Sequence, residues 1–397
     1  MNIEKIMITF EEAFRIVMGQ TFQTGKEEVS ISEAVGRALV VPVKSDMDMP
    51  PWNKSAVDGY ACCRNDLGSV LKVLETIPAG VMPTLPVATG TCSRIMTGAA
   101  VPEGADYVFM LEDTEEMEGG DVRFTGRPGN DNIARMAEDI HNGQTVLGPG
   151  HYLRPQDIAV MAMVGATRVT VRCRARVGVI STGSELVEPD QKPTGAQIRN
   201  SNSSQLMAQV ARAGALGSYY GVAPDEEKAI ERLLRQALEE NDVVLISGGV
   251  SFGDYDLVPK VMRNVGLTML FDQVAMQPGK PLTFCTGEKK AVFGLPGNPV
   301  STFVQFEVMV RPFLDRMAGV TVTEPQIIMP LAADYSRKRA ERLAWIPLTV
   351  TPAGEALPLE YHGSAHISAL TGAWGLIAIP RGQNWIQKGE MVNVRQI

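Results

Sequence analysis

The sequence predicts a multidomain fold of the α/β plus β class, with a central parallel α/β domain between smaller β domains and a helix-containing domain. The chain has 397 residues, and at roughly 150 residues per domain this length predicts two to four domains rather than one. Between residues 175 and 319, β-like runs alternate with amphipathic helices, which is typical of a parallel sheet with crossover helices. Short runs broken by Gly and Pro occupy 45–140 and 320–397, as in small β domains.

The composition narrows the classes of partner. Apolar residues make up 45% and charged residues 21%, as in compact globular proteins. No apolar segment reaches the roughly 20 residues of a membrane span, and "MNIEKIMITFEE" carries acids where a signal peptide has bases, so we expect a cytoplasmic protein without a membrane partner. The net charge of -8 disfavours nucleic acid. Five scattered cysteines without a C-x-x-C pair are expected to be reduced.

We group residues 1–44 and 141–174 as domain I. Thr9 followed by Glu12 is a capping box, and apolar residues at helical spacing follow it, so a helix is expected there. "RPQDIAVMAMVGA" predicts a helix with Pro155 near its first turn, and "TRVTVRCRARV" predicts a strand. Residues 45–140 are expected to form the small β domain II.

Domain III is expected at 175–319 and a C-terminal β-barrel, domain IV, at 320–397. The clearest helix of domain III begins near Asp225, where one apolar stripe is formed by Ala229, Ile230, Leu233, Leu234, Ala237 and Leu238. The run "KAVFGLPGNPVSTFVQFEVMVRPFLDRMAG" predicts a strand, a tight loop and a long helix.

Three loops of domain III share one pattern: a strand ends, small residues follow, and a helix can begin. They read "STGSEL", "SGGVSFGDYD" and "LPGNPVS". In open α/β sheets such loops meet beyond the carboxyl ends of the strands, where ligands bind. Glycine lets the backbone approach an anion, and helix N-termini supply free amides. One loop alone is more often an ordinary turn, but three in one domain favour an anion site.

Carboxylates accompany these loops: Glu185, Asp225, Asp254 and Asp256. Carboxylates repel phosphate unless a hard cation bridges them, and Mg²⁺ is usually held by one or two carboxylates plus phosphate oxygens. Asp225 follows Pro224 and has an alternative role as a helix cap. Asp256 has no such alternative, so it is the stronger candidate ligand.

Other chemistries fit less well. "QPGKP" lacks the spacing of a phosphate-loop NTPase, and no G-x-G-x-x-G opens a dinucleotide fold. His362 and His366 are four apart, but the "HGSAH" that contains them disfavours a helical metal pair. Only four histidines occur, which gives a Ser-His-Asp hydrolase little support.

Domain II also carries polar turns. Asp58 precedes Gly59 in "WNKSAVDGYA", and "RIMTGAAVPEGAD" places Arg94 and Thr97 in a glycine turn. Together they predict that domain II contributes to a cleft, opposite either its own domain III or that of a second subunit.

Seven motifs together resemble a known family: "NKSAVDGYA", "RIMTGAAVP", "AEDI", "STGSEL", "SGGVSFGDYD", "PGKP" and "LPGNPVS". They run in the order found in the molybdopterin molybdenumtransferases of the MoeA type, relatives of the gephyrin E domain. The resemblance implies a molybdopterin-binding domain III that inserts molybdate, or tungstate, into adenylylated molybdopterin with Mg²⁺ and releases AMP. It also implies an elongated four-domain subunit and a homodimer whose cleft joins domain III of one subunit to domain II of the other.

The resemblance also assigns residues. Catalytic positions fall on Asp58, Thr97, Asp139, Glu185 and Lys280. Asp225 and Asp256 match the Mg²⁺ ligands. The positions that hold molybdate or pterin fall on Gly183, Ser184, Gly248, Gly249, Ser251, Gly279, Gly297, Asn298, Ser301, Arg342 and Ser364. The partners implied are molybdopterin adenylyltransferase, which would donate the substrate, and recipient molybdoenzymes.

The chain departs from the family pattern in two stretches. Around "NIARMAEDI", an arginine cluster expected before the acids is reduced to Arg135. Where many members have lysines, "QVAMQPGKP" has Gln273 and Gln277, and an amide can donate to an oxyanion without neutralising it. We therefore expect altered oxyanion affinity. Two alternatives remain: the adenylyltransferase of the preceding step, which would not need the flanking domains, and a gephyrin-like non-catalytic scaffold, which would not need clustered acids at strand ends.

Overall fold

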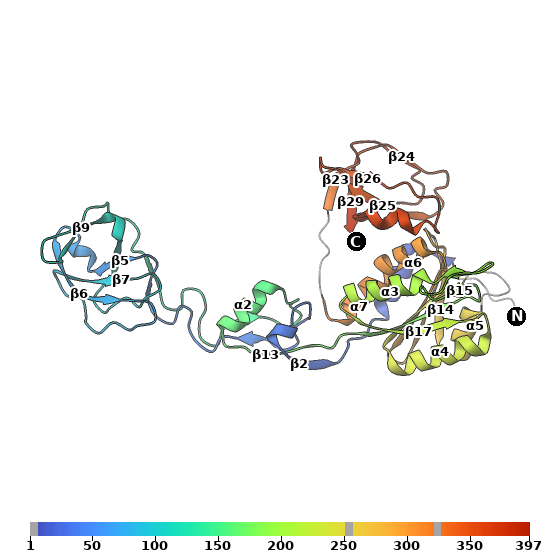
Figure 1. The fold of residues 1–397 in the computed structure, drawn as a ribbon, viewed down its shortest axis with the longest axis horizontal. Helices are drawn as coiled ribbons and strands as arrows, with labels where there is room; N and C mark the ends of the chain where they lie inside the picture. Colours follow the sequence, from blue (N-terminus) through green and yellow to red (C-terminus); the bar gives the residue numbers. More distant parts are fainter. Residues whose placement is uncertain (1–6, 251–256, 321–326) are drawn as a thin grey trace.

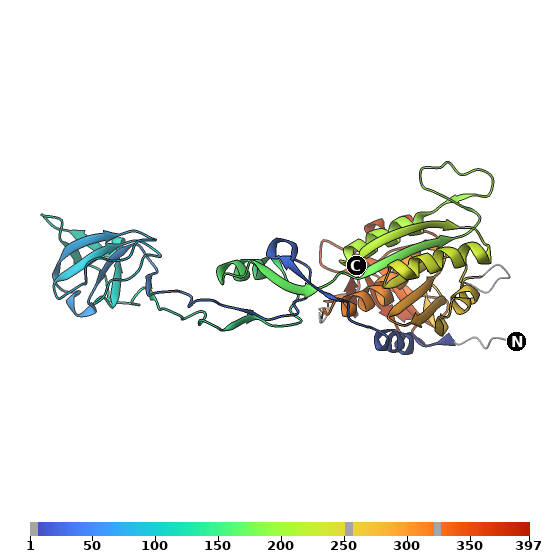
Figure 2. The same cartoon turned by 90° about the horizontal axis from the view of Figure 1, so that it is seen from below.

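The computed structural model describes residues 7–250, 257–320 and 327–397 and shows an elongated molecule. A body contains the central α/β domain and the C-terminal β domain, and a long arm carries a small β domain at its far end (Figure 1, Figure 2). The chain enters the arm after α1 (Phe10–Gly19) and returns to the body at β14 (Arg176–Thr182).

The body is organised around a seven-stranded mixed sheet. Its order is β1 (Met7–Ile8), β19 (Thr268–Val274), β21 (Pro281–Gly287), β22 (Lys290–Leu295), β18 (Val243–Ser247), β14 and β17 (Leu216–Ala223). β22, β18, β14 and β17 are parallel, as predicted. The sheet as a whole is mixed rather than parallel as expected, because β21 forms an antiparallel hairpin with β22 and also pairs antiparallel with β19.

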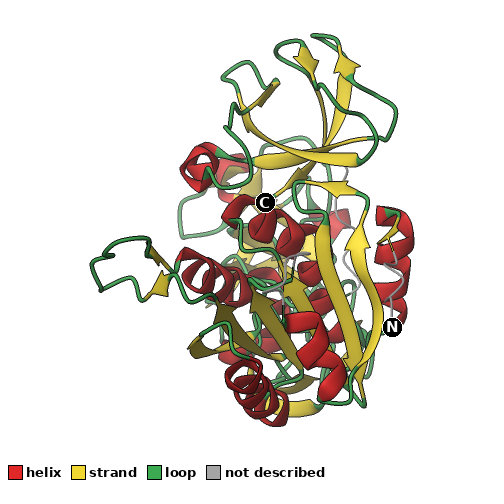
Figure 3. Cartoon of the chain, turned by 90° about the vertical axis from the view of Figure 1, so that its right-hand side faces the viewer, coloured by secondary structure: helices red, strands yellow, loops and turns green. Residues whose placement is uncertain are grey.

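Helices cover both faces of this sheet (Figure 1, Figure 3). One face packs against α1, α3 (Ser201–Arg212), α6 (Pro299–Gln305) and α7 (Arg311–Met317), and the other against α4 (Glu227–Glu240) and α5 (Val258–Asn264). Because both faces are covered, the central strands are apolar throughout: all five residues of β18 are buried.

The helix expected after Thr9 and the apolar stripe of α4 are present, but only the Thr9 half of the predicted capping box is formed. Thr9 caps α1, with its Oγ1 accepting a hydrogen bond from the Glu12 amide at 3.2 Å. The predicted stripe of α4 faces the core, where Ile230, Leu233, Leu234 and Ala237 are buried. The long helix after β22 is interrupted by a π-helical segment, Phe306–Val310. Pro312 follows this segment and has no N–H to donate back to it, which is consistent with the interruption.

The inner part of the arm joins distant pieces of the chain. β2 (Lys26–Ser30) pairs with β13 (Arg168–Arg172), and β3 (Val43–Lys44) pairs with β12 (Thr145–Leu147). The predicted helix is α2 (Pro155–Met163), with Pro155 at its first position. Residues 7–19, which the sequence places with this arm segment, instead lie on the body through β1 and α1.

The outer part of the arm is all-β. A six-stranded sheet has the order β8 (Tyr107–Met110), β5 (Gly59–Cys62), β7 (Thr91–Ile95), β6 (Val70–Ile77), β10 (Val122–Phe124) and β9 (Thr114–Glu116). Beside it, β4 (Lys54–Ser55) pairs with β11 (Ile133–Ala134).

The C-terminal domain is joined to the body by β20 (Met276–Gln277), a strand that ends about 50 residues before the first strand of the domain. Its sheet has the order β20, β25 (Leu343–Val350), β27 (Gly375–Ile379), β29 (Met391–Gln396) and β23 (Ile327–Pro330), with β26 (Ala356–Pro358) beside β25. A short pair is formed by β24 (Tyr335–Ser336) and β28 (Trp385–Ile386). Since β20 follows β19 directly, the segment 276–281 leads from this sheet back into β21 of the body.

All five cysteines are free. In the described ranges, none of the helices has the length and apolar character needed to cross a bilayer.

Gly59 is required where β5 meets β8. A Cβ at this position would lie 1.8 Å from the Phe109 carbonyl oxygen, whereas a Cβ at exposed Gly68 would have nothing within 4 Å. Substitution Gly59→Ala should therefore destabilise the outer β domain by about 1–3 kcal/mol or more, because backbone must move. Calorimetry of the whole chain should show a lowered transition for Gly59→Ala and an unchanged one for Gly68→Ala. Equal transitions in the two variants would contradict this account of the close approach.

Candidate functional site

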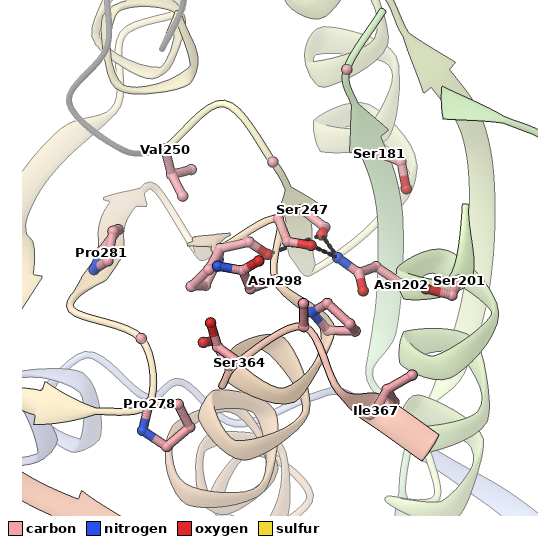
Figure 4. A pocket seen from close by; sticks show the side chains of 18 of the residues that line it. Ser181, Ser201, Asn202, Ser247, Val250, Pro278, Pro281, Asn298, Ser364 and Ile367 are labelled. Atoms are coloured by element: carbon pink, nitrogen blue, oxygen red, sulfur yellow. Dashed lines mark hydrogen bonds between the residues drawn. The ribbon is translucent and has the colours of Figure 1, made fainter. Parts of the chain in front are cut away.

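A cavity of about 1000 Å³ opens at the carboxyl ends of β14, β18 and β22 (Figure 4). Its lining includes residues from the loop that follows each of these strands, from the segment 277–281, and from the segment 361–367 of the C-terminal domain. We call it the loop cavity. The three loops singled out in the sequence therefore meet at one place, because their strands are adjacent and parallel.

Glycines bring the loop backbones close together. Gly248 has φ of 97°, and a Cβ there would lie 2.3 Å from the Thr182 carbonyl oxygen of the neighbouring loop. No other residue type fits this position without moving one of the loops. The other predicted glycines of the cavity lining are Gly183, Gly249, Gly279 and Gly297.

Asn202, which the sequence reading missed, holds two of the loops together. Its Nδ2 donates to Ser247 Oγ at 2.7 Å and to the Gly297 carbonyl oxygen at 2.8 Å (Figure 4). Within the described part of the chain its Oδ1 accepts no hydrogen bond although the residue is only 8% exposed, and the same holds for Oγ1 of buried Thr182. Buried polar atoms are normally paired, and both of these residues line the loop cavity.

Carboxylates lie at one side of the cavity. Asp225 Oδ2 accepts a hydrogen bond from the Ser184 amide at 3.0 Å, and Ser184 Oγ accepts one from the Asp225 amide at 3.1 Å. Asp225 thus joins two loops, and the alternative in which it caps a helix was wrong, because Glu226 is the N-cap of α4. Glu185 and Asp225 both line the cavity, whereas Ser184 is not part of the lining.

The predicted residues Ser251, Asp254 and Asp256 lie outside the described residues. Among the residues that are described, no group of three or more His, Cys, Asp or Glu side chains is placed to hold a metal ion. His362 and His366 belong to no such group. Their rings stack with centroids 5.4 Å apart, and His366 Nδ1 accepts a hydrogen bond from the His362 amide.

Cations line the same cavity. Lys280 and Arg342 are there as predicted, and Arg199 is a third, which the sequence reading missed. Arg342 Nη1 donates to the Met276 carbonyl oxygen at 3.2 Å, which holds the guanidinium beside the segment 276–281. Of the two glutamines that replace family lysines, Gln277 lines the cavity, while Gln273 is buried in β19 and does not.

Contacts between domains close the cavity. The Ser364 carbonyl oxygen accepts a hydrogen bond from the Val300 amide at 2.9 Å, so the C-terminal domain is attached to the start of α6. Gln305 Nε2 donates to the carbonyl oxygens of Gly279 and Pro281 at 2.8 and 2.9 Å, which anchors the segment carrying Lys280. Asn298, Ser301 and Ser364, all predicted, line the space between them.

The predicted arm residues are not in this cavity. Asp58 Oδ1 accepts hydrogen bonds from the Thr97 amide at 2.6 Å and from Thr97 Oγ1 at 2.8 Å. These bonds, the amide first, lower the pKa of the Asp58 carboxyl from its ordinary value. Asp58, Thr97 and Asp139 are all exposed, and β5 and β7 lie at the far end of the arm (Figure 1). One subunit alone does not bring them to the loop cavity.

Comparisons with known proteins cover most of the chain. Residues 8–165 match the MoeA N-terminal region (domain I and II), residues 178–316 match the probable molybdopterin binding domain, and residues 330–397 match the MoeA C-terminal region (domain IV).

Individual relatives agree with these matches. The molybdopterin molybdenumtransferase of Staphylococcus epidermidis is 33% identical over 99% of this chain and 97% of its own length, and that of Staphylococcus aureus is 32% identical over 98% and 95%. The crystal structure of the molybdopterin biosynthesis moeA protein from Pyrococcus horikoshii superposes with a TM-score of 0.85 at 31% identity, over 99% of this chain and 100% of that one. The chain therefore belongs to the MoeA family of molybdopterin molybdenumtransferases, transferases of molybdenum cofactor biosynthesis.

Proposed function

We propose that this protein inserts molybdate, or tungstate, into adenylylated molybdopterin and releases AMP in a Mg²⁺-dependent reaction. The observation that carries the proposal is the loop cavity itself. Three glycine-containing loops line it, and Lys280, Arg342 and Arg199 add positive charge beside the carboxylates Glu185 and Asp225. A ligand with phosphates and a polar ring system fits both the charges and the two unpaired oxygens of Asn202 and Thr182.

The residues have separable roles in this proposal. Lys280 and the loop amides would stabilise the negative charge that develops when the phosphoanhydride is cleaved. Arg342, held by the Met276 carbonyl oxygen, would offer its remaining N–H groups to the oxyanion. Asn202 and Thr182 would accept hydrogen bonds from the pterin, and Ser301 and Ser364 would complete the pocket around it.

A magnesium ion is compatible with the donor set at one side of the cavity. Asp225 and Glu185 both line it, and Mg²⁺ needs only one or two carboxylates when substrate phosphates supply further oxygens. Asp225 would hold the ion, with Asp256 as the second predicted ligand, and the bound ion would neutralise phosphate charge.

The arm residues imply a second subunit. Asp58 directly precedes β5 and Thr97 follows β7, two strands at the far end of the arm (Figure 1), and Asp139 follows β11; none of the three lines the loop cavity of the same chain. A homodimer in which each arm reaches the partner's cavity would unite both sets, so we propose that arrangement. Molybdopterin adenylyltransferase is the proposed donor of the substrate, and molybdoenzymes receive the product.

AMP release tests the proposed reaction. Purified protein with adenylylated molybdopterin, Mg²⁺ and molybdate or tungstate should release AMP, followed by chromatography, and chelation of the metal should stop it. Asp225→Asn should lower the rate by about tenfold to a thousandfold, since the metal ligand is lost. Lys228→Gln, an exposed change on α4, is the control. Substrate binding without AMP release under either oxyanion would reject the transferase and favour a gephyrin-like scaffold. AMP transfer from ATP to molybdopterin would favour the adenylyltransferase.

Subunit complementation tests the shared site. Asp58→Asn on the arm and Asp225→Asn in the body should each inactivate the enzyme, yet a mixture of the two subunits should recover activity, because one of the two sites in a mixed dimer then has both groups intact. The measurement is AMP release before and after the two variants are unfolded together and refolded. If the mixture stays as inactive as the separate variants, arm and body do not act across subunits.

Gln277 tests the charge of the oxyanion site. Because Gln277 lines the loop cavity and Gln273 does not, Gln277→Lys should strengthen molybdate binding by roughly threefold to thirtyfold through the added charge, and Gln273→Lys should not. Binding is measured by mass spectrometry or with radiolabelled oxyanion at fixed ionic strength. Equal molybdate affinities for the wild type and Gln277→Lys would show that the neutral amide does not weaken oxyanion binding.

A further inference from the structure

We propose that a second cavity, between arm and body, binds a small polyanion that carries two or more phosphate groups. This cavity has a volume of about 1070 Å³. One wall includes Arg37, Tyr152 and Arg172 from the inner arm, and the other includes the end of α3 and most of α7. We call it the arginine cleft. It shares no lining residue with the loop cavity, and the inference does not depend on the proposed reaction.

The charge of this cleft is opposite to that of the protein. Seven arginines line it, among them Arg37, Arg172, Arg174, Arg212, Arg311 and Arg316, although the chain as a whole carries a net charge of -8. Asp315 is the one carboxylate among the described residues of the lining. A cavity lined in this way concentrates positive potential and attracts anions.

A buried carboxylate holds two of the arginines in place. Glu307 has no exposed surface, and it lies in the π-helical segment between α6 and α7. It accepts hydrogen bonds from Gln209 Nε2 at 2.7 Å and Arg311 Nη1 at 3.2 Å, and forms an ion pair with Arg212 Nη2 at 2.7 Å. Because Glu307 engages one nitrogen of each arginine, the other guanidinium N–H groups remain available on the cleft wall.

The opposite wall is held in a similar way. Arg37, only 8% exposed, donates through Nε to the Arg172 carbonyl oxygen at 3.1 Å and pairs with Glu27. Arg172 Nη1 donates to the Thr24 carbonyl oxygen at 3.1 Å. Arginines fixed by their surroundings lose less entropy when they bind a ligand than mobile surface side chains do.

The residue type and the volume identify the class of ligand. Every cation of the described lining is arginine and none is lysine, and the planar guanidinium matches the paired oxygens of phosphate. The volume is that of a pocket for one small molecule, and the acidic surface of the chain disfavours a nucleic acid. Since the arginines stand on both walls, a ligand with several phosphates can bridge them and so stabilise one orientation of the arm.

Binding of inorganic tripolyphosphate tests this proposal. Titration calorimetry of the full chain should show binding that weakens with added salt. The double variant Arg174→Gln/Arg316→Gln, in which both residues are exposed and line the cleft, should bind at least about tenfold more weakly. Lys228→Gln/Arg232→Gln removes the same charge from exposed positions of α4 and should bind like the wild type.

Two further measurements make the result specific. The binding step that the arginine double variant weakens should persist in Lys280→Gln, whose change lies in the loop cavity. Loss of that step in Lys280→Gln, with full binding by the arginine double variant, would overturn the proposal. Light scattering should show the same oligomeric state for all variants. If the wild type binds no tripolyphosphate and the arginine double variant dissociates, a second copy of the chain covers the cleft and the proposal fails. Equal binding by both double variants would also reject it.

Discussion

The parallel pairing of β18 with both β14 and β22 is the constraint on which the rest of the body depends. It places three strand ends at one edge of the sheet, so that loops more than 40 residues apart in the sequence become neighbours. Gly248 then allows the loops to touch, and Asn202 ties the second loop to the third. A slip of one residue in this pairing would reverse the faces of the strands and separate these contacts.

Much of this arrangement can be predicted from the sequence, since the signals are local. The cap at Thr9 and the apolar stripe of α4 need only a few adjacent residues, and both are present in the structure. The direction of β21 was missed because the connection to β22 has none of the Asn-Gly or Asp-Gly signals of a tight hairpin. β1 is two residues long, which is too short to show a period, so its place in the body sheet has no signal in the sequence.

The site shows the same division. The glycine loops and Lys280 were found from their motifs and Arg342 from the family resemblance, and the structure brings them to one cavity. Asn202 and Arg199 were missed because their contribution depends on partners that only the folded chain supplies. Asn202 bonds to groups 45 and 95 residues away. The alternative in which Asp225 caps a helix was wrong, since the sequence does not reveal that the Ser184 amide lies next to its carboxylate.

The unpaired oxygen of Asn202 has a consequence for selectivity. Both donors of this side chain are committed to Ser247 and Gly297, so the amide cannot turn to suit a different ligand without breaking two bonds. A compound with an acceptor at that point would place its lone pair against the lone pair of Asn202 Oδ1. Both acceptors would lack a hydrogen bond, which would cost about 1–3 kcal/mol of binding free energy. A cost of that size corresponds to a discrimination of roughly tenfold to a hundredfold against such a compound, because the rigid amide penalises the wrong ligand rather than binding the right one more tightly.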